Sequence, residues 1–140
     1  KYRKMMVNRD SFIEKNYYIP TSEMISLIRS SDVVVLPYIE ATQSGIIPIC
    51  YQLSTPIVVT DTGSISEVVE HGKQGLVVPP KDEKLLADAI IALCMNKNMM
   101  QKMSREAHLA SKQKHSYTKI SRRNIAIYES AIRNFRRRKC

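Results

Sequence analysis

Short apolar runs alternate with stretches of helical period along most of the chain. Three of these runs contain almost no polar residues, at positions 33–36, 56–60 and 76–78, and we expect each to form a strand. Runs of this kind are typical of strands that are buried on both faces of a parallel sheet. A further strand is predicted at residues 17–19 (YYI), and Pro20 can end it. The pattern therefore predicts an α/β fold, a three-layer Rossmann-like parallel sheet with helices on both faces.

Helix start signals follow the predicted strands. An apolar stripe begins after Gly45, and Pro48 is tolerated only in a first helical turn, so a helix should begin near Gly45. Ser64 is the first residue of a capping box, Ser-Ile-Ser-Glu, which predicts the start of a second helix. Asp82 is a favourable N-cap for a third helix with a clear apolar stripe, and another helix is expected over residues 98–114.

Positive charge is concentrated at the end of the chain. The net charge is +9, but residues 1–100 carry 10 basic and 11 acidic residues, whereas residues 101–140 carry 12 and 2. We expect a basic C-terminal helix over residues 118–140, ending in Arg136, Arg137, Arg138 and Lys139. That run could make a weak contact with an anionic membrane, and nucleic acid is not the expected partner. A solvated helix end, favoured by the helix dipole, remains the alternative interpretation.

Length and cysteine content restrict the class of protein. The 140 residues fit one domain, 1–140, but are few for a complete enzyme built around a cleft, and no apolar run approaches the roughly 20 residues of a membrane span. Residue 1 is not Met, so the chain is expected to be a piece of a longer protein. Cys50, Cys94 and Cys140 lack the spacing of a zinc or redox motif, and the first two are predicted to be buried. A reducing, cytoplasmic setting is expected.

Two loops, residues 38–45 and residues 61–64, each join a predicted strand to a predicted helix and could bind phosphate. Backbone N–H groups at a helix start have no intrahelical partner, and neighbouring hydroxyl groups also favour an anion. The same residue types are common in turns and caps, so a purely structural role remains open. No P-loop, dinucleotide fingerprint, catalytic triad, carboxylate pair or metal cluster is present in the sequence. The candidate ligands are Thr42, Gln43, Ser44, Gly45, Gly63 and Ser64.

A series of ordered landmarks is shared with one known family. The landmarks are residues 32–37 (DVVVLP), Gly45, residues 55–63 (TPIVVTDTG), residues 67–69 (EVV), Gly72, residues 75–79 (GLVVP), Asp82 and residues 86–90 (LADAI). Their order resembles that of the C-terminal lobe of retaining GT-B glycosyltransferases of group 1, which are similar to glycosyltransferase family 4. The resemblance implies that the lobe is truncated at its N-terminus in this chain.

This resemblance implies a hexosyltransferase that moves a sugar from a nucleotide-sugar, a UDP- or GDP-sugar, to a glycan or lipid-linked acceptor with retention of configuration. It implies no metal and no other cofactor. The donor would lie on this lobe, a missing N-terminal lobe would complete the cleft, and this part alone would be inactive. The enzyme would be cytoplasmic or peripheral to the inner face of the membrane. The alternative is a nonenzymatic Rossmann-like module that binds an anionic partner or membrane through its basic C-terminal tail.

One departure from the family concerns its acidic residues. The family commonly has two glutamates eight residues apart, one on the donor sugar and one on the ribose. Counted back from Thr55, these positions hold Ala41 and Ile49, and neither side chain can accept a hydrogen bond. Glu40, one place from the first position, is the candidate contact with the donor sugar. Catalytic residues are otherwise not identified.

Overall fold

The computed structural model describes residues 8–113 and 117–137 of the chain. Three short strands form one parallel sheet in the order β1-β2-β3: β1 (Val34–Leu36), β2 (Ile57–Thr60) and β3 (Gly75–Val78). A 3-10 turn, η2, precedes six α-helices: η2 (Arg9–Ser11), α1 (Thr21–Ser30), α2 (Ile46–Gln52), α3 (Ile65–Val68), α4 (Glu83–Met95), α5 (Lys97–Gln113) and α6 (Tyr117–Arg137). All three predicted strands in the body are confirmed within one residue at each end, and α2 starts directly after Gly45 as predicted.

The central strand β2 explains the layering. Its four residues are all buried, as the unbroken apolar run predicts. Ile57 and Val59 point into one cluster with α1, α2 and α3, whereas Val58 points into the other cluster with Leu93 of α4. Alternate residues of a strand face opposite sides, so two helical layers are needed to cover this one sheet. The three-layer α/β prediction is confirmed.

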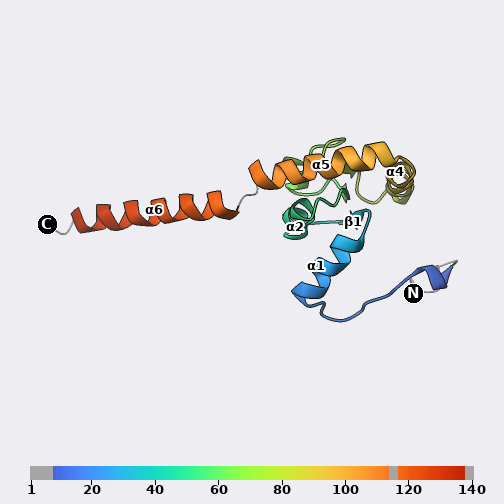
Figure 1. Ribbon diagram of the computed structural model, residues 1–140, viewed down its shortest axis with the longest axis horizontal. Coiled ribbons are helices and arrows are strands. Elements are labelled where there is room, and N and C mark those ends of the chain that lie inside the picture. Colours follow the sequence, from blue (N-terminus) through green and yellow to red (C-terminus); the bar gives the residue numbers. More distant parts are fainter. Residues whose placement is uncertain (1–7, 114–116, 138–140) are drawn as a thin grey trace.

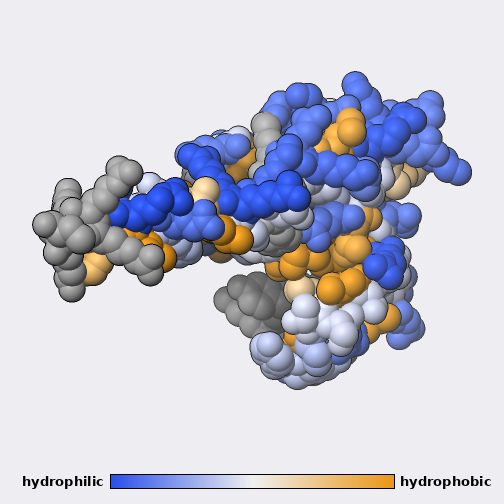
Figure 2. All heavy atoms as spheres, turned by 60° about the vertical axis from the view of Figure 1, so that its left-hand side comes forward, coloured by the Kyte–Doolittle hydropathy of each residue, from blue (hydrophilic) through white to orange (hydrophobic). Residues whose placement is uncertain are grey.

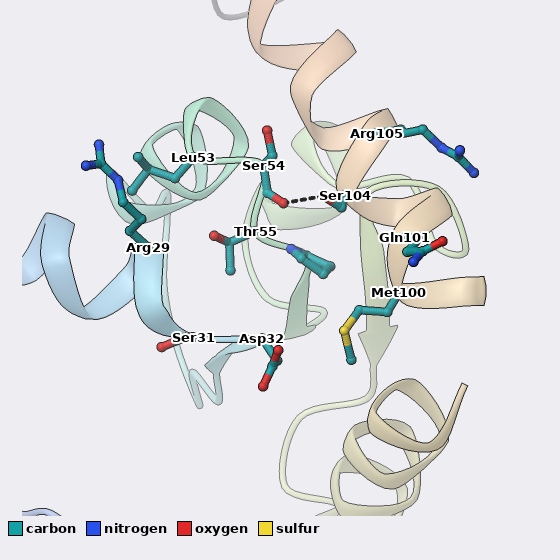
Figure 3. Close-up of a pocket in the computed structure, with 11 residues that line it drawn as sticks. Arg29, Ser31, Asp32, Leu53, Ser54, Thr55, Met100, Gln101, Ser104 and Arg105 are labelled. Carbon is teal, nitrogen blue, oxygen red and sulfur yellow. Dashed lines mark hydrogen bonds between the residues drawn. The ribbon is translucent and has the colours of Figure 1, made fainter. Parts of the chain in front are cut away.

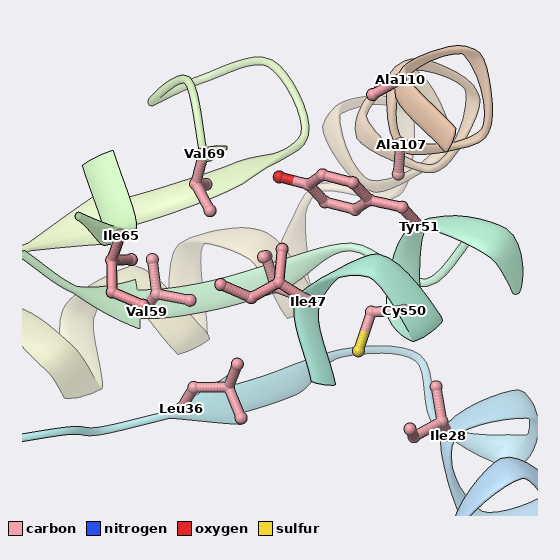
Figure 4. Close-up of a cluster of buried hydrophobic side chains, with 11 residues drawn as sticks. Ile28, Leu36, Ile47, Cys50, Tyr51, Val59, Ile65, Val69, Ala107 and Ala110 are labelled. Atoms are coloured by element: carbon pink, nitrogen blue, oxygen red, sulfur yellow. The ribbon is translucent and has the colours of Figure 1, made fainter. Parts of the chain in front are cut away.

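The larger core cluster surrounds α2 (Figure 4). The ring of Tyr51 is fully buried against α5, and its hydroxyl donates to the Val68 carbonyl oxygen at 3.2 Å. Cys50 is also fully buried, and burial raises the pKa of its thiol from 9.0 to about 11. A thiol with that pKa stays protonated at neutral pH, so Cys50 acts as a small apolar side chain.

Three local predictions are wrong. Residues 17–19 form no strand, and Tyr18 is 87% exposed, because a strand needs a partner and the described sheet ends at β1. Ser64 does not cap α3 through its side chain, since its hydroxyl is bonded to the Thr42 carbonyl instead. Cys94 is exposed, because Leu93 is the residue of α4 that is buried and the next residue lies on a different side of the helix. The predicted cap of α4 is confirmed: Asp82 Oδ1 accepts from the N–H of Leu85 at 2.9 Å.

The last helix lies apart from this body. Figure 1 shows α6 projecting away from α5, and every described side chain from residue 118 to residue 135 is exposed. The helix predicted over residues 118–140 is observed to residue 137, and its last three residues lie outside the described part of the chain. Among the described residues, none of the helices combines the length and the apolar character that a membrane span requires.

Candidate functional site

An open hollow lies where β1 and β2 end. In a parallel sheet, the carboxyl ends of neighbouring strands meet at one edge, and the loops that follow them form the usual ligand site. Here the loop after β1 and the loop after β2 border an open hollow of about 570 Å³. The lining residues are Ile39, Glu40, Ala41, Thr42, Thr62 and Gly63.

The two loops are held together at Gly63 and Ser64. Gly63 has a φ of 55°, and a Cβ atom there would overlap the carbonyl oxygen of Ala41 and lie 2.9 Å from its carbonyl carbon. Only glycine permits both this conformation and this approach. The next residue, Ser64, donates to the carbonyl oxygen of Thr42 twice, from its backbone N–H at 3.1 Å and from Oγ at 2.6 Å. These contacts fix the loop after β1 and the loop after β2 relative to each other.

The loop after β1 has a second set of anchors. Thr60, at the end of β2, donates from Oγ1 to the carbonyl oxygen of Tyr38 at 2.6 Å. The hydroxyl of Tyr38 in turn lies 3.0 Å from Ser44 Oγ, which accepts weakly from the N–H of Ile46 at 3.4 Å. These bonds fix both ends of the segment between β1 and α2, so the hollow is formed before any ligand arrives.

The structure places the predicted site residues in three positions. Glu40, Thr42 and Gly63 line the hollow. Ser64 lies behind it, with its hydroxyl committed to Thr42.

Gln43, Ser44 and Gly45 are not part of the lining and form the connection into α2. Their N–H groups donate to no acceptor among the residues that the structure describes, so the fold leaves these three donors unused.

Thr62 is a lining residue that sequence reasoning missed. Its Oγ1 is buried and has no hydrogen-bond partner within the described part of the chain. A buried hydroxyl group without a partner is destabilising, typically by about 1–3 kcal/mol, and is uncommon in folded proteins. The only signal in the sequence was its place beside Gly63, because threonine itself is common in loops.

The charge around the hollow is negative. Of the six described residues that line it, Glu40 alone is ionisable, and none is a lysine or an arginine. Ile49, at the position of the family's second glutamate, packs against the core, so it offers no polar group to a ligand. Among the described residues, no group of three His, Cys, Asp or Glu side chains could hold a metal ion.

A second cavity, of about 430 Å³, lies at the opposite edge of the sheet, between α1, the end of α2 and α5 (Figure 3). Its best-defined polar contact is internal, because Ser104 Oγ donates to the Ser54 carbonyl oxygen at 2.6 Å. The guanidinium groups of Arg29 and Arg105 point away from the cavity in Figure 3. Without converging donors, this cavity is a weaker anion site than the hollow at the carboxyl ends.

Curated proteins are similar to this chain in sequence. D-inositol 3-phosphate glycosyltransferase of Corynebacterium urealyticum is 30% identical over 115 residues, which are 79% of this chain and 26% of that protein. Phosphatidyl-myo-inositol mannosyltransferase of Mycobacterium leprae is 27% identical over 104 residues, which are 74% of this chain and 28% of that protein. The chain thus spans about a quarter of the length of these curated relatives.

Solved structures agree on the fold. Sucrose-phosphate synthase from Thermosynechococcus elongatus superposes with a TM-score of 0.74 at 18% identity, over 80% of this chain and 28% of that one. Anabaena HepE in complex with UDP-glucose gives a TM-score of 0.70 at 20% identity, over 74% and 29%. The fold of this chain is that of GT-B glycosyltransferase C-terminal domains. The model of the family described as "Glycosyl transferases group 1" matches residues 7–96, more than half of the chain, and the chain therefore belongs to that glycosyltransferase family.

Proposed function

We propose that this chain is the donor-binding lobe of an enzyme that transfers a sugar from a UDP- or GDP-sugar to a glycan or lipid-linked acceptor, with retention of configuration. The observation that carries the proposal is the preformed hollow of about 570 Å³ at the carboxyl ends of β1 and β2. Family membership supports the transfer chemistry. Complexes of Anabaena HepE with UDP and UDP-glucose support the donor class, and the name of one curated relative, phosphatidyl-myo-inositol mannosyltransferase, supports a lipid-linked acceptor.

Within this proposal, each loop residue has a role that its environment permits. The free N–H groups of Gln43, Ser44 and Gly45 bind the diphosphate, assisted by the hydroxyl of Thr42. Glu40 accepts a hydrogen bond from a hydroxyl group of the donor sugar. Gly63 and Ser64 position the loop and do not hold the ligand, because one contacts the backbone of Ala41 and the other is bonded to Thr42.

The rest of the enzyme has to supply what the hollow lacks. A diphosphate brings at least two negative charges next to Glu40, and none of the described residues that line the hollow is basic and could balance them. We assign those cations, and the acceptor site, to the missing N-terminal lobe and the residues before this segment. The chain alone then binds nucleotides weakly and does not turn over. Metal independence is part of the proposal and rests on the resemblance to the family.

Calorimetric titration with UDP, GDP and UDP-glucose tests the assignment. The expected dissociation constants are about millimolar, which corresponds to about 4 kcal/mol. Gly45→Val should abolish nucleotide binding, since a branched side chain keeps phosphate from the N–H groups. A Cβ at Gly45 meets nothing within 4 Å, so the backbone has room for a side chain there, and the unfolding midpoint of the variant checks that it folds. Glu40→Ala should weaken UDP-glucose more than UDP. Equal affinity of both Gly45 forms for UDP would refute the diphosphate assignment.

Location is a separate part of the proposal. The free thiols Cys50 and Cys94 fit a reducing compartment, so we place the enzyme in the cytoplasm. The basic residues Arg136, Arg137, Arg138 and Lys139, whose side chains lie outside the description, are proposed to make a weak contact with the inner face of the membrane. Deleting residues 136–140 should lower sedimentation with anionic vesicles. Unchanged sedimentation would leave this run as a solvated helix end.

A further inference from the structure

Thr62 carries a hydroxyl group that the fold leaves unpaired. The hydroxyl groups of Ser44, Thr60 and Ser64, in or beside the same two loops, each have a partner in the loop after β1, at 3.0, 2.6 and 2.6 Å. Among the buried side-chain nitrogen and oxygen atoms of the described residues, Thr62 Oγ1 alone has no hydrogen-bond partner. This one group in the wall of the hollow is therefore free to bond to a ligand.

Solvent does not satisfy the hydroxyl of Thr62 in its present position. Hydrophilic side chains cover much of the face shown in Figure 2, and polar groups at such a surface bond to water. Thr62 Oγ1 is buried although the residue as a whole is half-buried, so the exposed part of Thr62 consists of its other atoms. A rotation of about 120° about χ1 moves the hydroxyl to another staggered position. The group can therefore turn outward when a partner enters the hollow.

The lining of the hollow indicates which partner fits. Thr62 and Glu40 line the same space of about 570 Å³, and of its six described residues only Glu40 is ionisable. The carboxylate of Glu40 would repel a phosphate group inside the hollow, whereas a neutral sugar can donate its hydroxyl hydrogens to that carboxylate. A threonine hydroxyl both donates and accepts hydrogen bonds, as a sugar hydroxyl does. The hollow therefore favours the sugar over the diphosphate, which the proposed function places outside this lining at residues 43–45.

We propose that Thr62 binds the sugar part of the donor: its hydroxyl, unpaired in the free chain, turns into the hollow and hydrogen-bonds to a hydroxyl group of the sugar. This assignment rests on the proposed function and adds to it a residue that distinguishes a sugar nucleotide from the nucleoside diphosphate alone. The unpaired hydroxyl destabilises the free chain, and the bound sugar supplies the missing partner. Removing the hydroxyl should therefore strengthen the fold and weaken the binding of the sugar, a combination that a threonine with a structural role does not give.

The substitution Thr62→Val removes the hydroxyl and keeps a side chain branched at Cβ. Calorimetry first identifies which of UDP-glucose, UDP-galactose and GDP-mannose binds the unchanged chain most tightly. T62V should bind that sugar nucleotide about fivefold more weakly, which is about 1 kcal/mol for one hydrogen bond, and should bind its nucleoside diphosphate as before. The thermal unfolding midpoint of T62V should rise by roughly 4 °C. T62S keeps the hydroxyl and should bind the sugar nucleotide as the unchanged chain does.

Thr55 provides a matched control at the opposite edge of the sheet (Figure 3). Its buried hydroxyl donates to the Ile28 carbonyl oxygen at 3.2 Å, so T55V should lower the unfolding midpoint and leave sugar-nucleotide binding unchanged. Three results would overturn the assignment of Thr62 alone: T62V binds the sugar nucleotide as tightly as the unchanged chain, T62V weakens the sugar nucleotide and the nucleoside diphosphate equally, or T62V fails to raise the midpoint. The proposed function fails differently, through the unchanged chain binding none of the three sugar nucleotides, and that result overturns the assignment with it.

Discussion

Replacing Gly63 with alanine should destabilise the chain by more than its conformation alone explains. A left-handed backbone at φ 55° disfavours alanine by about 1–2 kcal/mol. The new Cβ would also overlap the backbone of Ala41, which cannot rotate away as a side chain could, and overpacking of this kind costs about 1–3 kcal/mol. The expected loss in the free energy of unfolding is therefore about 2–5 kcal/mol. Urea denaturation with an unchanged m-value measures it.

Gly72 provides the matched control for this substitution. Its φ of 80° is also left-handed, but a Cβ there meets nothing within 4 Å, so Gly72→Ala should lose only the conformational part, about 1–2 kcal/mol. Should Gly63→Ala not fold, Ser64→Ala removes one of the two bonds to Thr42 and should lose about 1 kcal/mol. Equal losses at Gly63 and Gly72 would refute the claim that the two loops are locked by this close approach.

Three further predictions concern the body of the fold. Asp82→Ala should lower the free energy of unfolding by about 1 kcal/mol in thermal or urea denaturation, since α4 loses the acceptor for the Leu85 N–H, and an unchanged midpoint would contradict the cap. A thiol reagent at neutral pH should modify Cys94 in the native chain and reach Cys50 only after unfolding, and rapid native labelling of Cys50 would disprove its burial. Stability should fall between pH 9 and about 11, because the unfolded Cys50 thiol ionises first and the buried thiol resists ionisation. The slope is about 1.4 kcal/mol per pH unit, and Cys50→Ala should remove this part of the pH dependence, which a full set of denaturation curves would show.

Local residue patterns predicted the strands well because each strand lies entirely within this chain. The run of residues 56–60 is apolar without alternation, and burial on both faces of β2 is its direct consequence. Residues 17–19 are equally rich in strand-forming side chains, but such side chains form a strand only where the backbone can pair with a neighbouring strand. No described strand is available beside them, so Tyr18 is left in water.

The sequence predicts the edge of the sheet at which the candidate site lies, but it does not predict the hydrogen bonds of the individual residues there. Chain order alone places the loops after β1 and β2 at one edge of the sheet, and Glu40, Thr42 and Gly63 of the predicted residues line the hollow there, so their part in ligand binding stays a prediction. The bond from Ser64 to Thr42 spans 22 residues, and no local signal distinguishes it from a helix cap. Thr62 was missed for a related reason, because the lack of a partner for its hydroxyl is visible only in three dimensions.

The proposed function requires that a nucleotide-sugar binds in the hollow between the loops after β1 and β2. Backbone amide NMR of the labelled chain, titrated with UDP-glucose to millimolar concentration, tests it most directly. We expect shift changes at the amides of residues 40–45 and 62–63 with little change around Ser54 and Ser104 in the cavity at the other edge. Shifts confined to that second cavity, or no shifts at either edge, would contradict it.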